Sequence, residues 1–249
     1  IKDILVISTL ADTPRFKELL CDGSQFGVKL SYKVQPSPDG LAQAFTLGKD
    51  FINGEPCAMI LGDNIFYGNG FTELLKNATA DAQQGKATVF GYYVNDPERF
   101  GVVDFDKNGK AISIEEKPAH PKSNYAVTGL YFYPAGVSEK AAQVKPSARG
   151  EVEITSLNEM YLNEDNLNVQ LLGRGYAWLD TGTMQSLVEA SNYVKMVEER
   201  QGIAVSAPEE IAYIHGWIDK DKLLEAANHY GKSPYGQHLK SVAEGKLRY

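Results

Sequence analysis

The chain has 249 residues and a formal net charge of -7. This acidic balance excludes a general nucleic-acid-binding surface, because phosphate backbones are bound by clustered Lys and Arg. No apolar stretch reaches membrane-spanning length and no signal-peptide pattern is present, so we expect no membrane partner. The two cysteines, Cys21 and Cys57, lack a CxxC spacing, which favours a reduced, cytoplasmic setting.

The first ninety residues alternate between strand and helix patterns. The sequence predicts strands at Ile4–Ser8, Leu30–Val34, the apolar run after Cys57 and Ala87–Val94, with helices at Thr13–Leu20, Leu41–Phe51 and Phe71–Gln84. This alternation predicts a mostly parallel sheet flanked by helices, with right-handed crossovers.

A carboxylate follows the strand that begins at Cys57. The unbroken apolar run predicts a strand buried on both faces, and it stops at Gly62-Asp63-Asn64. Ligands of such sheets bind at the carboxyl ends of the strands, so Asp63 is a candidate for holding a divalent ion. The alternative is that Asp63 and Asn64 only turn the chain and cap a helix.

The loop from Gln35 to Gly40 also follows a strand. Its two prolines and its glycine make it stiff, so it can present Gln35 and the Gly40 backbone to a ligand. A glutamine amide donates and accepts, which suits the edge of a pyrimidine base. An ordinary strand-to-helix turn is the alternative interpretation.

The pattern then changes to antiparallel. Strands at Gly101–Asp106 and Ala111–Glu116 flank an Asn-Gly pair, which is a strong hairpin signal. Pro118 ends the second strand directly after Glu116 and Lys117. A lysine at this place suits a phosphate and a glutamate suits sugar hydroxyls, whereas the alternative is a solvated charged edge.

A second strand-end carboxylate appears later in the chain. The sequence predicts a strand at Tyr176–Leu179, then Asp180, then a helix that runs to about Arg200. Two such carboxylates can jointly hold Mg²⁺, which prefers one or two carboxylates with substrate phosphates and water.

Further predicted elements are a strand at Tyr125–Tyr133, helices at Val137–Val144 and Glu153–Asn163, and a strand at Leu167–Leu172.

Residues 201–249 show helical patterns and no strand pattern. Helices are predicted at Pro208–Ile214, Asp219–Asn228 and Pro234–Ala243, and the segment carries Trp217, Tyr230, Tyr235 and Tyr249. We therefore expect an α/β protein of the Rossmann-like type, with a core over residues 1–200 and a small antiparallel part. Residues 201–249 would form a C-terminal helical appendage that could serve as an oligomer interface.

Seven motifs in order resemble one family. They are QPSPDGLAQA at 35–44, LGDNIFYG at 61–68, DPERFGVV at 96–103, IEEKP at 114–118, VTGLYFY at 127–133, RGEVEI at 149–154 and LLGRGYAWLDTGT at 171–183. The set closely resembles the glucose-1-phosphate thymidylyltransferases, which are bacterial sugar nucleotidyltransferases. The similarity extends over the whole chain.

The resemblance implies that glucose 1-phosphate attacks the α-phosphorus of dTTP and gives dTDP-glucose and pyrophosphate. It implies a Mg²⁺ held by Asp63 and Asp180, a thymine reader formed by Gln35 and Gly40, and a homotetramer. Lys117 and Arg149 would bind the sugar phosphate. The sugar would be lined by Asn64, Gly101, Glu116, Val127 and Tyr131.

Two features depart from the family pattern. Phe100 stands where many relatives carry Tyr, and the Gly-rich nucleotide signature expected before the first strand is absent from the 249 residues. The chain begins without Met, so we expect a preceding segment and little turnover by these residues alone. Two alternatives stay open: a related glycosyltransferase, which usually shows Asp-x-Asp at the strand end, and a non-catalytic nucleotide-sugar binding or regulatory module.

Overall fold

A computed structural model describes residues 1–247, and the chain divides into two compact units. Ser37–Ala190 form the sheet unit, and Ile1–Pro36 together with the residues from Ser191 onward form the terminal unit. This division differs from the predicted boundary after residue 200, because the C-terminal helices pack with the first residues of the chain. Tyr249, predicted to belong to the helical appendage, lies outside the described residues.

The sheet unit is built on a six-stranded mixed sheet. Four strands run in one direction and β7 and β8 run in the other. The α/β class is confirmed, but the hydrogen-bonded neighbours are mostly antiparallel, because β8 runs against each strand beside it. The strands are β3 (Cys57–Ile60), β5 (Ala87–Tyr93), β6 (Gly101–Phe105), β7 (Ala111–Glu116), β8 (Tyr125–Tyr133) and β9 (Leu167–Leu172).

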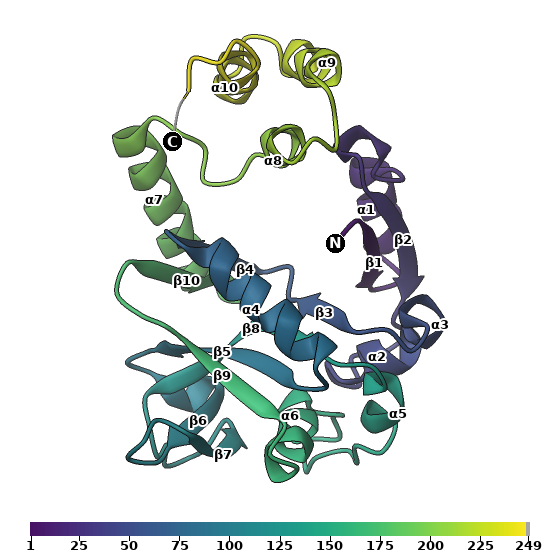
Figure 1. Cartoon of the computed structure of the whole chain (residues 1–249), viewed down its shortest axis with the longest axis vertical. Helices are drawn as coiled ribbons and strands as arrows, with labels where there is room; N and C mark the ends of the chain where they lie inside the picture. Colours follow the sequence, from purple (N-terminus) through teal and green to yellow (C-terminus); the bar gives the residue numbers. More distant parts are fainter. Residues whose placement is uncertain (248–249) are drawn as a thin grey trace. The chain divides into compact units, whose positions relative to one another are not determined.

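Strand β8 lies at the centre of this sheet (Figure 1). One edge pairs with β5, while the other edge pairs with β6 near Tyr125 and with β3 near Tyr133. Its side chains alternate between two faces. Leu130 and Phe132 pack on one face with residues of α4 (Phe71–Gln83), in a hydrophobic cluster that includes Phe90 and Ala78. Strand β8 thus pairs with β3, β5 and β6 and also contributes to this hydrophobic cluster.

The opposite side of the sheet carries the largest hydrophobic cluster. Helix α6 (Ile154–Asn163) contributes Leu157 and Tyr161, and α5 (Val137–Ala141) contributes Val137. Tyr133, with no exposed surface, packs edge to face on Phe45 at 5.0 Å between ring centroids. These helices were predicted nearly at their observed bounds.

Two predictions about the first strands were wrong. Residues 64–68, for which no strand was predicted, form β4 (Asn64–Gly68), which pairs antiparallel with β10 (Tyr176–Asp180). Ile65, Phe66 and Tyr67 are strong strand formers, which explains the pairing. Strand β3 is not buried on both faces, because its first three residues are only partly buried and Ile60 is 60% exposed; among the described strands it pairs with β8 alone.

The predicted helix at Leu41–Phe51 is divided by Gly48. It forms two short helices, α2 (Gln43–Leu47) and α3 (Lys49–Ile52). Glycine weakens a helix interior because it loses more backbone entropy than other residues, so a break at Gly48 is expected.

A short 3₁₀ helix, η2 (Pro97–Arg99), precedes β6.

The terminal unit combines both ends of the chain. Strands β1 (Asp3–Ser8) and β2 (Lys29–Val34) pair in parallel. Helix α7 (Met184–Gln201) begins in the sheet unit and ends here, and Leu223 and Leu239 form a core with no exposed surface. The Lys2 ammonium lies 5.5 Å above the Trp217 ring. The other elements are α1 (Thr13–Leu20), η1 (Ser24–Phe26), α8 (Pro208–Ile214), α9 (Lys220–Tyr230) and α10 (Pro234–Ala243).

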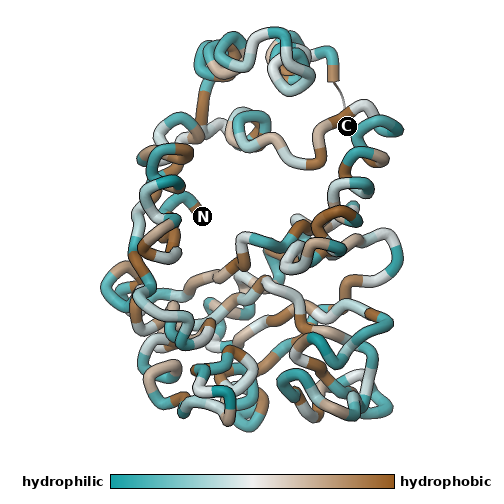
Figure 2. Tube along the Cα trace, turned by 180° about the vertical axis from the view of Figure 1, so that it is seen from behind, coloured by the Kyte–Doolittle hydropathy of each residue, from teal (hydrophilic) through white to brown (hydrophobic). Residues whose placement is uncertain are grey.

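The hydropathy of the helices fits their packing. In Figure 2 the helical coils alternate between hydrophilic and hydrophobic colours, as helices with one buried face do. Among the described residues, no helix is both long and apolar enough to cross a membrane.

Gly129 on β8 has no room for a side chain. A Cβ there would lie 2.6 Å from Asn64 Oδ1 and 2.9 Å from Leu61 Cβ. We predict that Gly129→Ala destabilises the protein by about 2 kcal/mol, because overpacking shifts anchored neighbours. Gly173→Ala is the matched control, since its Cβ would meet nothing within 4 Å. Thermal denaturation of both variants checks this, and equal midpoints would contradict it.

Candidate functional site

A cavity of about 560 Å³ opens over one face of β8. Val127, Gly129 and Tyr131, which alternate along that strand, form its floor. Its walls come from the ends of β7 and β10, from the segment before β6 and from the loop that leads into α6. The remaining lining residues are Leu41, Leu61, Asn64, Arg99, Phe100, Gly101, Glu116, Lys117, Arg149, Glu151, Glu153, Ile154, Thr155, Trp178, Asp180, Gly182 and Thr183.

The pairing of β4 with β10 brings the two strand-end carboxylates together. Asn64 is directly opposite Asp180, and the Thr181 N–H and hydroxyl both donate to the Asp63 carbonyl oxygen, at 2.9 and 2.8 Å. A Cβ built on Gly182 would lie 3.0 Å from Asp180 Oδ1 and 3.6 Å from Asp63 Oδ2. The two oxygens are therefore separated by no more than the sum of these distances.

This pair of carboxylates fits the ligand set of a hard divalent ion. Mg²⁺ takes oxygen ligands at about 2.1 Å and uses one or two carboxylates with substrate phosphates and water. Among the described residues, no group of three or more His, Cys, Asp or Glu side chains could hold a metal ion. Asp63 and Asp180 thus offer a partial site that a phosphate substrate would complete.

The Asn64 side chain holds these strand ends in place. Its Oδ1 accepts hydrogen bonds from Trp178 Nε1 at 2.5 Å and from the Gly129 N–H at 3.0 Å, and its Nδ2 donates to Asp63 Oδ1 at 2.8 Å. These bonds link β4 to β8 and β10. Asn64, predicted to line the sugar, therefore has most of its hydrogen-bonding capacity engaged within the protein.

Glu116 is oriented by α6. The Thr155 hydroxyl donates to Glu116 Oε2 at 2.5 Å, and Thr155 is buried. A Cβ on Gly101 would lie 2.9 Å from Thr155 Oγ1 and 3.5 Å from Glu116 Oε2, so Gly101 leaves the space that this pair occupies. The carboxylate of Glu116 is therefore fixed at the cavity wall, where it can accept hydrogen bonds from hydroxyl groups.

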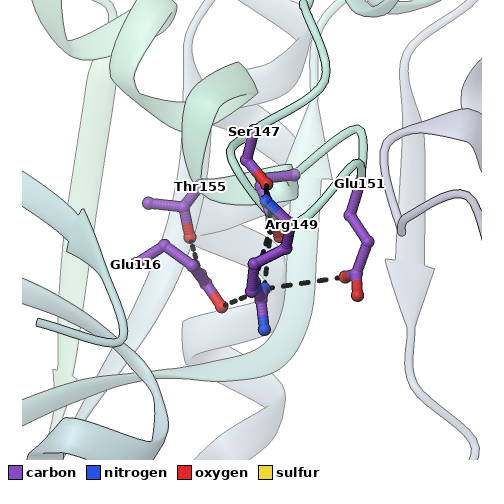
Figure 3. A network of polar contacts seen from close by, with 6 residues as sticks. Glu116, Ser147, Arg149, Glu151 and Thr155 are labelled. Carbon is purple, nitrogen blue, oxygen red and sulfur yellow. Dashed lines mark hydrogen bonds and ion pairs between the residues drawn. The ribbon is translucent and has the colours of Figure 1, made fainter.

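Arg149 lies among three carboxylates (Figure 3). Its Nε and Nη2 donate to Glu153 Oε1 at 3.2 and 2.8 Å, and Nη2 lies 3.5 Å from Glu116 and 3.6 Å from Glu151. These neighbours raise the pKa of Arg149, with the hydrogen bond to Glu153 as the largest cause. The Arg149 side chain remains 42% exposed and lines the cavity.

Lys117 has an unusual backbone conformation. Its φ is 44°, in the left-handed region that favours glycine, and its N–H donates to the Phe100 carbonyl at 2.9 Å. A non-glycine residue in this region costs roughly 1 kcal/mol, and such residues cluster at functional sites. Among the described residues, Lys117 forms no ion pair. Its ammonium group is therefore available to an anion in the cavity.

The cavity brings together eight of the eleven predicted site residues. Asp63 lies beside it, next to Gly182. Gly40 packs against the Val152 backbone, where a Cβ would lie 2.4 Å from the carbonyl oxygen, so it supports the loop of Arg149. Gln35 belongs to the terminal unit. The eight are Asn64, Gly101, Glu116, Lys117, Val127, Tyr131, Arg149 and Asp180.

Tyr131 lies at the base of the cavity and is almost fully buried. Burial raises the pKa of its phenol, and the Glu116 and Asp63 carboxylates add to the shift. The hydroxyl therefore stays protonated at any physiological pH.

The sequence reasoning missed several lining residues. Arg99 pairs with Asp96 at 2.7 Å and stacks on the Phe100 ring, which packs edge to face on Trp178 at 5.1 Å. Arg99 lies in the DPERFGVV motif beside Phe100, which was noted above as replacing a Tyr of many relatives. Glu153 lies in RGEVEI and Thr155 directly follows it, so the motifs contained these residues although spacing alone could not assign them to the cavity.

The structure is an α/β protein whose mixed sheet carries a cavity lined by both cations and carboxylates, an arrangement that suits a phosphorylated ligand. A family model described as nucleotidyl transferase matches residues 1–196. The chain belongs to the nucleotidyl transferase family.

Within this family, the chain is similar to proteins of one named activity. The chain is 57% identical over 240 residues to a glucose-1-phosphate thymidylyltransferase of Neisseria gonorrhoeae, a match that covers 96% of this chain and 82% of that protein. It is 55% identical over 244 residues to the enzyme of that name from Xanthomonas campestris, covering 98% and 82%. These matches confirm the resemblance predicted from the seven motifs.

A solved structure agrees. The chain superposes with a TM-score of 0.69 on a crystal structure from Bacillus anthracis, described as a candidate glucose-1-phosphate thymidylyltransferase in complex with sucrose. The sequence identity is 40%, and the match covers 78% of this chain and 76% of that one.

We predict that Asn64→Ala destabilises the protein by about 2 kcal/mol, because it leaves the Trp178 and Gly129 donors without their acceptor. Asn64→Asp keeps an acceptor for both and should retain more stability. Urea denaturation measures both variants, and an Asn64→Ala variant as stable as the parent would contradict this role.

Proposed function

We propose that this chain transfers a thymidylyl group from dTTP to glucose 1-phosphate and releases dTDP-glucose and pyrophosphate. The observation that supports it most is the cavity itself, which is lined by the fixed carboxylate of Glu116, by the cations Lys117 and Arg149 and by Asp180. Such a cavity suits a ligand with hydroxyl groups at one end and phosphate at the other. The names of the closely similar relatives fit this ligand.

The reaction needs placement more than acid or base chemistry. A sugar phosphate oxygen is already ionised and can attack the α-phosphorus in line, with pyrophosphate as the leaving group. The barrier then depends on neutralising charge that is spread over phosphate oxygens. In this proposal Lys117 and Arg149 bind the sugar phosphate, while Glu116, Asn64, Gly101, Val127 and Tyr131 line the sugar.

Enzymes of the nucleotidyl transferase family use a divalent metal ion. We propose Mg²⁺ as this ion and Asp63 with Asp180 as its protein ligands, because their carboxylates converge beside Gly182. When bound, the ion would neutralise phosphate charge. Asp180 is further kept in place by the Gly182 N–H, which donates to its Oδ1 at 2.8 Å.

The remaining assignments concern the base and the assembly. Gln35 and Gly40 are the proposed readers of the thymine base. A homotetramer and a cytoplasmic location are also proposed, and the two free cysteines, Cys21 and Cys57, fit a reducing compartment. Light scattering of the purified protein would measure the oligomeric state directly.

The first test is product formation. We predict that the intact protein, mixed with dTTP, glucose 1-phosphate and Mg²⁺, releases pyrophosphate and forms dTDP-glucose, and that a chelator stops both. Asp180→Asn should lower kcat by about 10²-fold or more, because it weakens charge stabilisation in the transition state. Asp50→Asn, an exposed change on α3, is the control. Binding of dTDP-glucose without pyrophosphate release would instead favour a non-catalytic module.

The second test concerns Lys117. We predict that Lys117→Gly raises the KM for glucose 1-phosphate at least about tenfold, because it removes a phosphate-binding charge. Its melting temperature should stay equal or rise, because glycine relieves the positive φ. Lys107→Ala, an exposed change in the β6–β7 turn, is the control. A matching loss of stability, or an equal effect on the KM for dTTP, would indicate a structural role for Lys117.

A further inference from the structure

The three carboxylates around Arg149 are not equivalent. Glu153 is 6% exposed, and its Oε1 accepts three hydrogen bonds: from Ser147 Oγ at 2.8 Å, from Arg149 Nε at 3.2 Å and from Arg149 Nη2 at 2.8 Å. The side chains of Glu116 and Glu151 are 25% and 41% exposed and approach Nη2 only at 3.5 and 3.6 Å. Only Glu153 therefore binds the guanidinium through two nitrogens.

The position of Glu153 in the chain is a second observation. It is the N-cap residue of α6, where Ser, Thr, Asp or Asn normally caps the first turn, and its side chain makes no capping hydrogen bond. The carboxylate is directed to Arg149 and Ser147 instead. The N-cap position of α6 thus carries a residue that contacts the cavity residue Arg149 and does not cap the helix. Such a conflict between local preference and the observed contact is typical of functional sites.

We propose that Glu153 is a positioning residue, which acts through Arg149 to set the geometry of the site for an anionic substrate. This inference rests on the proposed role of Arg149 in binding the phosphate of glucose 1-phosphate. An arginine side chain loses about 2 kcal/mol of rotamer entropy when it is fixed, and a guanidinium already held by Glu153 has lost most of it before the substrate arrives. Ser147 supports the same oxygen and completes the anchor.

Positioning and simple electrostatics predict opposite changes in anion binding when Glu153 loses its charge. Removing a negative charge near an anion site strengthens anion binding if charge alone matters. Loss of positioning weakens it. The change in KM of a neutral variant at residue 153 therefore distinguishes the two effects.

The experiment compares three glutamine variants by steady-state kinetics with both substrates. Glu153→Gln should raise the KM for glucose 1-phosphate about tenfold, the range of a charge-assisted hydrogen bond, and leave the KM for dTTP within about twofold. Glu151→Gln removes only the long contact and should leave the KM for glucose 1-phosphate unchanged or lower. Glu159→Gln, an exposed change on α6, is the control. A lower KM in Glu153→Gln, or equal shifts for both substrates, would overturn the proposal.

A second variant separates positioning from stability. Glu153→Ser removes the carboxylate but supplies a preferred helix cap, so α6 should not be weakened while the KM rises as in Glu153→Gln. In an Arg149→Ala background, Glu153→Gln should give no further increase, because its effect passes through Arg149. Additive increases would show that Glu153 acts independently of Arg149 and overturn the inference.

Calorimetric titration with glucose 1-phosphate reads the same site without turnover. If the parent protein releases no pyrophosphate, the proposed function fails, and the titrations still decide the role of Glu153. Binding that is about tenfold weaker in Glu153→Gln than in Glu159→Gln supports the positioning role. Equal affinities in the two variants contradict it.

Discussion

The reversed strand β8 is the constraint on which the sheet unit depends. It runs against β3, β5 and β6, and its length of 9 residues lets β6 and β3 pair with different parts of one edge while β5 takes the other. Its strict alternation places Leu130 and Phe132 on the face that packs with α4, and Val127 and Tyr131 on the face that carries both the cavity and the largest hydrophobic cluster. One strand therefore gives the unit both its core and the floor of its site.

The charge balance of the cavity makes pairing decisive. The lining residues include Glu116, Glu151, Glu153 and Asp180 but only three cations, Arg99, Lys117 and Arg149. A cavity of this composition attracts an anion only where its carboxylates are engaged by other groups. The Thr155 hydroxyl engages the Glu116 carboxylate, and a metal ion would engage Asp180. Among the cations, Arg99 is already paired with Asp96. In the described structure, Lys117 is the cation in the cavity without an ion pair.

Local patterns predicted most elements, and local patterns together with the family resemblance named eight of the residues that line the cavity. Periodicity and caps located β8, β9, α8 and α10 at their observed bounds, and carboxylates at strand ends identified Asp63 and Asp180. The pattern could not show which strands pair, because register is decided by long-range packing. For that reason β4 was not predicted, and the exposure of Ile60 and the anchoring role of Asn64 were not foreseen. Glu153 was missed because its partners are specified only by the geometry of the loop before α6.

The bond between Asn64 and Trp178 joins residues that are 114 positions apart in the chain. Contacts of such separation form late in folding, because the entropy of closing a long loop is lost before they can stabilise anything. During synthesis, Asp63 emerges long before β10, so the two carboxylates cannot converge until the strand at Tyr176–Asp180 has left the ribosome. A growing chain therefore cannot assemble this pair of carboxylates, and a ligand that needs both of them can stabilise only molecules whose synthesis has passed that strand.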